Sequence, residues 1–182
     1  MLPPPLAEFL ELALRELPGK PLLPQRFELL AHRGSEMLVL EPGRRLTGDA
    51  GVLLTRVSYL KPGPEHSFAV VDAAMNDLLR PALYDAWHEV RPVRPRNERS
   101  RIWQIVGPVC ESADFLARDR ELALAEGDLL AILSAGAYAM AMSSNYNSRP
   151  RAAEVLVDGG TMHLVGRRET VGELFARESR LP

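Results

Sequence analysis

The sequence has a single cysteine, nearly equal numbers of positive and negative residues, and no long apolar run. Its single cysteine, Cys110, excludes an intrachain disulfide framework and Cys-rich zinc sites, and it fits a reducing cytoplasm. The apolar stretches 129–133 and 135–142 are broken by glycine and serine and are too short to span a bilayer. A net charge of −2 gives no reason to expect nucleic acid or a membrane surface as a partner.

Other absences narrow the function further. The four histidines show no metal-ligand spacing, so no metal site is expected. The first residues lack a basic region followed by an apolar core, so we expect no signal peptide. Apolar residues make up 46% and charged residues 25%, which is typical of a soluble globular protein.

The hydrophobic pattern changes character near residue 50. Before it, residues 6–17 have helical spacing, and the apolar run 37–40 suits a strand buried on both faces, as in a parallel sheet or barrel. After it, β-rich segments dominate, with one stretch of helical spacing at 77–87 and a hairpin signal at Asp158-Gly159-Gly160. The predicted strands are 52–60, 67–71, 101–106, 129–133, 153–157 and 161–165, and a short helix is predicted within 169–177. We therefore predict an α+β chain with a mostly antiparallel β domain.

Two local motifs combine a charged group with a partner suited to binding. Glu41-Pro42-Gly43-Arg44 offers a carboxylate, a glycine that allows close backbone approach, and a guanidinium suited to phosphate or carboxylate. A tight turn with an incidental salt bridge would give the same motif. Arg80 and Tyr84 stand at i and i+4 of a predicted helix and could bind a carboxylate together, although a surface arginine packed over a tyrosine is as common.

Two further motifs place a reactive or aromatic group in an unusual setting. Cys110-Glu111 follows Gly107-Pro108, so the chain turns sharply just before the thiol; most lone cysteines are simply small buried apolar residues. Tyr138 lies among alanines and a glycine, which would let a ligand lie against its ring, but close packing also requires small residues. Taken singly, none of the four motifs decides a function.

Together, four segments in order resemble the C-terminal part of diaminopimelate decarboxylases, which join a (β/α)8 barrel to a β domain. They are EPGR (41–44), VVDAAMNDLLRPALYDAWH (70–88), GPVCESADFLA (107–117) and GDLLAILSAGAYAMAMSSNYNSRPRAAEVLV (127–157). The resemblance runs from about Leu40 to near Arg177, and residues 1–36 match less well. It implies that residues 1–50 are the end of the barrel and 51–182 the β domain, whose last helix may be shared with the barrel.

The resemblance implies a set of residues that bind pyridoxal 5'-phosphate. Glu41 would keep the pyridine nitrogen protonated, which makes the ring a better electron sink. The backbone at Gly43 would approach the phosphate, Arg44 would contact phosphate or substrate, and Tyr138 would contact both cofactor and substrate. The chain's two lysines, Lys20 and Lys61, do not resemble the family's cofactor-binding lysine. We therefore expect the isolated chain to be inactive.

The resemblance also implies how an amino acid would be bound. Arg80 and Tyr84 would hold its distal carboxylate, and Glu111 its distal ammonium group. Cys110 would protonate the carbanion left after CO2 is lost. Glutamate after the cysteine, where ornithine decarboxylases commonly have aspartate, favours meso-diaminopimelate as substrate and lysine as product.

Family members are head-to-tail homodimers in which the Cys-Glu segment reaches the partner's site, so the resemblance implies shared active sites in a homodimer. Three explanations of the missing lysine stay open. The chain is a fragment of a complete enzyme, a short paralogue without catalysis, or a partner of a separate barrel-bearing chain. A non-catalytic β-domain module that dimerises with, or regulates, a full-length decarboxylase is the alternative function.

Overall fold

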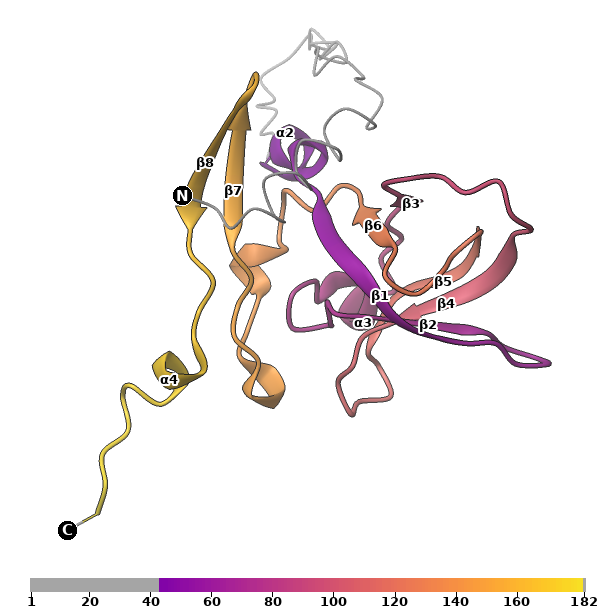
Figure 1. Ribbon diagram of the computed structural model, residues 1–182. Coiled ribbons are helices and arrows are strands. Elements are labelled where there is room, and N and C mark those ends of the chain that lie inside the picture. The colour runs from indigo at the N-terminus through magenta and orange to yellow at the C-terminus, as the bar shows by residue number, and fades with distance from the viewer. Residues whose placement is uncertain (1–42, 182) are drawn as a thin grey trace, which may run out of the picture.

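The computed structural model describes residues 43–181, and most of them belong to strands or to the loops between them (Figure 1). Six strands form one sheet in the order β3-β6-β1-β2-β4-β5. The strands are β1 (Leu53–Lys61), β2 (Phe68–Val71), β3 (Val90–Pro92), β4 (Arg101–Val106), β5 (Phe115–Leu122) and β6 (Leu129–Ile132). A separate two-stranded sheet consists of β7 (Glu154–Asp158) and β8 (Thr161–Gly166). The mostly antiparallel β domain predicted from the sequence is confirmed.

One pair of strands in the large sheet departs from the antiparallel pattern. β2 and β4 run parallel, with Val70 opposite Val106, whereas every other pair in this sheet is antiparallel. Parallel strands need a crossover connection, and this one contains α3 (Arg80–Tyr84) and β3. Because the two strands point the same way, the segments that follow Val71 and Val106 leave the sheet at the same edge.

The core lies along the large sheet, where apolar side chains from all its strands meet. Its largest fully buried apolar side chains are those of Leu78, Ile105, Leu116, Leu130, Ile132, Val57 and Val71. Burial alternates along much of β1 and β2, as expected for strands with one covered face. β6 is buried at three of its four positions, which agrees with its nearly continuous apolar sequence.

The helices are short. α2 (Gly43–Thr47) and the 3-10 turn η1 (Gly48–Ala50) precede β1. Two more 3-10 turns, η2 (Met140–Met142) and η3 (Tyr146–Ser148), follow β6. α4 (Val171–Leu174) begins at Thr170 with a capping box to Glu173. Among the described residues, no helix has the length and hydrophobicity needed to cross a membrane.

The structure differs from the sequence-based expectation at two segments. The pattern at 77–87 yields only α3, because Asp85 adopts a left-handed conformation (φ 51°) that ends the helix. The charged stretch 115–122, for which no strand was predicted, is β5, held by its pairing with β4. The apolar run 37–40 and the predicted helix at 6–17 lie outside the described residues, so the predicted barrel piece stays a prediction.

Gly51 and Gly136 bring the start of the domain against the segment after β6. A Cβ atom built on Gly136 would lie 2.0 Å from the Thr47 carbonyl oxygen and 2.7 Å from the Gly51 backbone nitrogen. Backbone hydrogen bonds complete the contact: the Gly136 N–H donates to the Gly48 carbonyl (2.9 Å), and the Ala135 N–H donates to the Gly51 carbonyl (2.9 Å). The contact fixes α2, which contains Arg44, beside the segment that leads to Tyr138.

Candidate functional site

Arg80, Tyr84 and Tyr138 meet in space, although Tyr138 is more than fifty residues away in sequence. The guanidinium carbon of Arg80 lies 5.3 Å from the centroid of the Tyr84 ring and 5.3 Å from that of the Tyr138 ring. Both distances fall within the range of a cation–π contact. Both rings remain exposed, Tyr84 by 60% and Tyr138 by 46%, so a ligand could reach them. We call these three residues the arginine cluster.

Arg80 itself has unused hydrogen-bonding capacity. Its Nε atom is buried and donates to no acceptor within the described residues. A buried guanidinium N–H without a partner is costly, and it is a group that a bound carboxylate would satisfy. The i, i+4 placement of Arg80 and Tyr84 on one helix was predicted and is confirmed; the contact of Arg80 with the Tyr138 ring was not predicted.

Tyr138 stands in a backbone conformation that its side chain rarely adopts. Its φ is 62°, in the left-handed region that favours glycine. Its neighbours are packed into the fold: Ala137 is buried and Ala139 packs against the core. Strained backbone of this kind persists where the surrounding fold demands it, often at ligand sites.

A positively charged environment surrounds His88, which is buried next to this region. Its Nδ1 lies 2.9 Å from the Leu133 carbonyl oxygen, to which it can only donate. Burial lowers the pKa of His88, and the positive charges of Arg44, Arg80 and Arg120 lower it further. Arg120 also touches this residue directly, because its Nη2 donates to the His88 carbonyl oxygen (3.0 Å).

Cys110 and Glu111 lie on an exposed loop that follows β4, and we call residues 107–114 the thiol loop. Both side chains are exposed. The Glu111 carboxylate accepts a hydrogen bond from the Tyr146 hydroxyl at 3.1 Å. This hydrogen bond raises the pKa of Tyr146, as does the negative charge of Glu111. No hydrogen bond or ion pair joins the thiol loop to the arginine cluster within residues 43–181.

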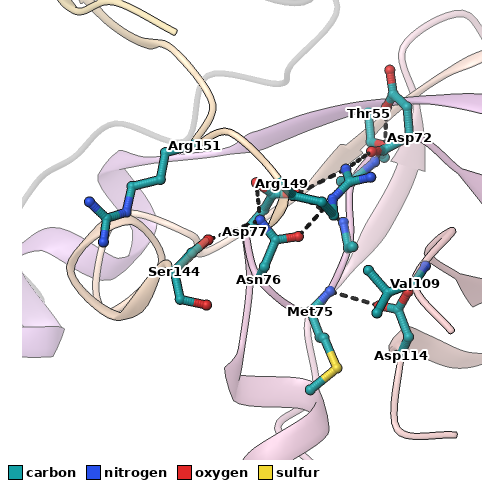
Figure 2. A network of polar contacts seen from close by, with 12 residues as sticks. Thr55, Asp72, Met75, Asn76, Asp77, Val109, Asp114, Ser144, Arg149 and Arg151 are labelled. Atoms are coloured by element: carbon teal, nitrogen blue, oxygen red, sulfur yellow. Dashed lines mark hydrogen bonds and ion pairs between the residues drawn. The ribbon is translucent and has the colours of Figure 1, made fainter. Parts of the chain in front are cut away.

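Asp114 holds the thiol loop in shape from its buried end. Its Oδ2 accepts from the Val109 N–H (2.8 Å), and its Oδ1 accepts from the Met75 N–H (2.7 Å), as Figure 2 shows. Burial raises the pKa of Asp114, whereas these two backbone donors act in the opposite direction. A side chain on Gly107 would collide with the same carboxylate, because its Cβ would lie 2.4 Å from Oδ2.

We expect the substitution Asp114→Asn to lower the free energy of unfolding by about 2 kcal/mol, since one of the two backbone N–H groups would then face an amide NH2. Urea denaturation of both proteins, followed by tryptophan fluorescence, measures the difference. Asp158→Asn is the control, because Asp158 is exposed at the end of β7 and its carboxylate makes no hydrogen bond within the described residues. An unchanged urea midpoint for Asp114→Asn would contradict the role given to its two oxygens.

A second polar network fixes the loop that contains Tyr146. Asn76, only 2% exposed, donates to the Ser144 carbonyl (3.3 Å) and accepts from Arg149 Nε (2.9 Å) through its side chain. Arg149 also donates to the Asp72 carbonyl (2.6 Å) and lies 3.7 Å from the Asp77 carboxylate. Figure 2 shows how these groups converge from the segment after β2 and from the loop 143–151.

The predicted site residues are thus placed in two groups. Arg80, Tyr84 and Tyr138 form one, and Cys110 with Glu111 belongs to the other; Gly43 and Arg44 begin α2, and Glu41 lies outside the described residues. Sequence reasoning assigned no role to four residues that shape the site: Asn76, Asp114, Tyr146 and Arg149. All four lie within the quoted motifs, but only the folded chain shows which partners they have.

Comparisons with known proteins give the chain its relatives. Residues 32–136 match the family described as pyridoxal-dependent decarboxylase, C-terminal sheet domain. The chain is 66% identical over 145 residues to the diaminopimelate decarboxylase of Pseudomonas aeruginosa, covering 80% of this chain and 35% of that protein. It is 55% identical over 180 residues to the diaminopimelate decarboxylase of Pseudomonas fluorescens, covering 99% of this chain and 40% of that protein.

The fold is shared with solved structures as well. The crystal structure of the M. jannaschii diaminopimelate decarboxylase in complex with L-lysine superposes with a TM-score of 0.74 at 39% identity, over 76% of this chain and 32% of that one. The chain therefore spans about a third to two fifths of the length of these relatives. The chain belongs to the pyridoxal-dependent decarboxylases, to whose C-terminal sheet domain residues 32–136 correspond.

Proposed function

We propose that this chain supplies the β-domain side of the active site of a pyridoxal-phosphate-dependent decarboxylase that converts meso-diaminopimelate into lysine and CO2, a carboxy-lyase of amino-acid biosynthesis. The observation that supports it most is Arg80, whose buried, unpartnered Nε lies beside two exposed tyrosine rings. A guanidinium with an unused N–H is suited to a carboxylate such as that of an amino acid. The substrate is inferred from the names of the relatives given above, and Arg80 is the group in this chain that would bind its carboxylate.

The residues at the start of the domain fit a phosphorylated cofactor. Among the described residues, apart from its chain neighbours and the backbone of its own helix, no heavy atom lies within 4 Å of a Cβ atom built on Gly43, and Arg44 beside it is exposed. Within the part of the chain that the structure describes, this backbone is therefore open to a ligand. Gly43 and Arg44 would hold the phosphate, Tyr138 would contact the ring, and Glu41 stays a prediction for the pyridine nitrogen. Pyridoxal phosphate, when bound, supplies an electron-withdrawing ring that stabilises the negative charge left when CO2 departs.

The other residues would orient the substrate and move a proton. Arg80 and Tyr84 bind the distal carboxylate, which fixes the reacting end of the amino acid at a set distance from α3. Glu111 pairs with the distal ammonium group. Cys110 holds a proton at Sγ and transfers it to the α-carbon once CO2 has left, a general-acid role that a thiol can fill. A reduced thiol is needed for that step, which fits a cytoplasmic enzyme.

A homodimer with shared sites accounts for the separation of the two groups. Glu111 and Cys110 are exposed, and within residues 43–181 neither forms a hydrogen bond or ion pair with the arginine cluster of its own chain. In a head-to-tail dimer, the thiol loop of one chain would complete the site of the other. The alternative, a non-catalytic module that binds a full-length decarboxylase, would leave both groups without a substrate.

A chimeric enzyme tests the proposal. The region of the Pseudomonas aeruginosa relative that matches this chain is replaced by this chain's 145 matched residues, so that the relative's barrel provides the cofactor lysine. We expect the purified chimera to bind pyridoxal phosphate and to release CO2 and lysine from meso-diaminopimelate. The 182-residue chain alone, under the same conditions, is expected to release none. A folded, cofactor-bound chimera without turnover would overturn the catalytic proposal and favour the non-catalytic module.

A further inference from the structure

Tyr146 and Glu111 make a contact that neither local sequence nor the secondary structure requires. Tyr146 begins η3, Glu111 lies on the thiol loop, and 35 residues separate them. The Tyr146 hydroxyl donates to Oε2 of Glu111 at 3.1 Å, and within the described residues the Glu111 side chain makes no other hydrogen bond. Both residues are exposed, so the contact faces solvent in this chain.

Both backbones are anchored on the same short segment after β2. On the Glu111 side, Asp114 connects the thiol loop to Met75 through its two oxygens. On the Tyr146 side, the Asn76 carbonyl accepts from the Ser144 N–H at 3.0 Å, and the Asn76 side chain holds the Ser144 carbonyl and Arg149. Residues 75 and 76 therefore hold the backbones on both sides of the contact, and the hydroxyl and the carboxylate are kept within hydrogen-bonding distance.

A glutamate side chain without partners on an exposed loop samples several rotamers. When it binds a cation it is restricted to one of them, and this loss of side-chain entropy weakens binding. A hydrogen bond to one carboxylate oxygen removes much of this freedom in advance and leaves the other oxygen free to accept from an ammonium group. Preorganisation of this kind improves binding without a new contact to the ligand. The Tyr146 hydroxyl oxygen also keeps a lone pair for the same ammonium group.

We propose that Tyr146 is a positioning residue for Glu111 and that the pair makes the site selective for amino acids with a distal ammonium group. This inference rests on the proposed function. It goes beyond that function in assigning selectivity to a residue outside the arginine cluster and the thiol loop. The elevated pKa of Tyr146, caused first by its hydrogen bond to Glu111, agrees with the geometry.

The contact itself is tested on the 182-residue chain, without cofactor or substrate. The absorbance of tyrosinate near 295 nm is followed against pH for the wild type, Glu111→Gln and Tyr146→Phe, and the spectrum reports the chain's four tyrosines together. We expect Tyr146→Phe to remove one component of the wild-type titration, which identifies it as Tyr146, and we expect the same component to move to lower pH in Glu111→Gln. Identical titration curves for the wild type and Glu111→Gln would overturn the contact.

Selectivity is tested in the pyridoxal-phosphate-bound enzyme that contains this chain. Two quantities are measured: kcat/KM for meso-diaminopimelate and the inhibition constant of 2-aminopimelate. The inhibitor keeps the distal carboxylate of the substrate but lacks its distal amine. Tyr146→Phe should lower kcat/KM for meso-diaminopimelate roughly 10-fold, mainly through KM, and leave inhibition by 2-aminopimelate unchanged. Tyr59→Phe, a change of the same kind at an exposed position of β1, should change neither.

The outcomes separate this inference from the proposed function. Without turnover in the wild-type enzyme, the proposed function fails, and the titration still decides the contact. With turnover, equal losses for both ligands would reduce Tyr146 to a structural role and overturn the inference. A double-mutant cycle adds a further criterion: combined with Glu111→Gln, Tyr146→Phe should cost less than it does alone, and fully additive losses would also overturn it.

Discussion

Replacement of Gly136 by alanine is expected to lower the free energy of unfolding by about 3 kcal/mol, a large effect for a single added methyl group. The new Cβ would lie 2.0 Å from the Thr47 carbonyl oxygen, far inside van der Waals contact, and 2.7 Å from the Gly51 nitrogen. All the nearest atoms are backbone, so no side chain can rotate away. The segment after β6 must then separate from η1, which breaks the hydrogen bond from the Gly136 N–H to the Gly48 carbonyl.

Urea denaturation measures this change, and Gly172→Ala provides the control. Gly172 lies in α4, and within residues 43–181 a Cβ atom built on it meets nothing within 4 Å beyond its chain neighbours and its own helix backbone. Alanine is the better helix former, so the control protein should be as stable as the wild type or slightly more stable. If Gly136→Ala unfolds at the same urea concentration as Gly172→Ala, the close approach of Gly51 and Gly136 is not a constraint on this fold.

Loss of the guanidinium at position 80 should abolish most activity in the assembled enzyme. For Arg80→Met we expect kcat/KM for meso-diaminopimelate to fall by roughly 100-fold or more, about 3 kcal/mol, because a charge-assisted fork to the distal carboxylate is lost. Arg80→Lys keeps the charge without the planar fork and should recover only part of the loss. The two variants together separate charge from geometry at this position.

Arg101→Met is the matched control for this prediction. Arg101 also lies over an aromatic ring, 6.0 Å from the centroid of the Trp103 ring, but it stands at the start of β4, whereas the thiol loop follows the end of that strand. Its kcat/KM should equal that of the wild type. A substrate analogue without the distal carboxylate tests the role of Arg80 directly. If Arg80→Met weakened the binding of this analogue as much as the binding of meso-diaminopimelate, Arg80 would not bind the distal carboxylate.

Most of the strands could be predicted from the sequence, because they rest on local patterns of apolar residues and turns. The segment 52–60 was predicted nearly as it stands in β1, and Gly159-Gly160 connects the predicted hairpin. β5 could not be predicted in this way, since its charged sequence has no apolar alternation and its pairing with β4 is decided by tertiary contacts. The same limit applied to the end of α3, where one left-handed residue stops a helical pattern.

Sequence motifs named the groups that could carry chemistry, but they could not show the groups that hold them. Arg80 and Tyr84 were linked by helical spacing, which is local. The contacts from Asn76 to Arg149 and from Glu111 to Tyr146 join residues separated by 73 and 35 positions, and no periodicity reports such pairs. The role of Asp114 could not be predicted either. The sequence does not distinguish a buried aspartate that binds backbone N–H groups from a solvated aspartate in a loop.

The parallel pairing of β2 with β4 has a consequence for the order of folding. A hairpin can form from neighbouring residues within microseconds, but this pair joins strands on either side of a crossover of about thirty residues, so the chain must first close a long loop. This pairing brings the end of β4, where the thiol loop starts, beside the end of β2, which leads to residues 75 and 76. We therefore expect a newly made chain to acquire the proposed substrate-binding geometry after the local hairpins have formed, and variants that slow this step to delay the appearance of activity in the assembled enzyme without changing its final level.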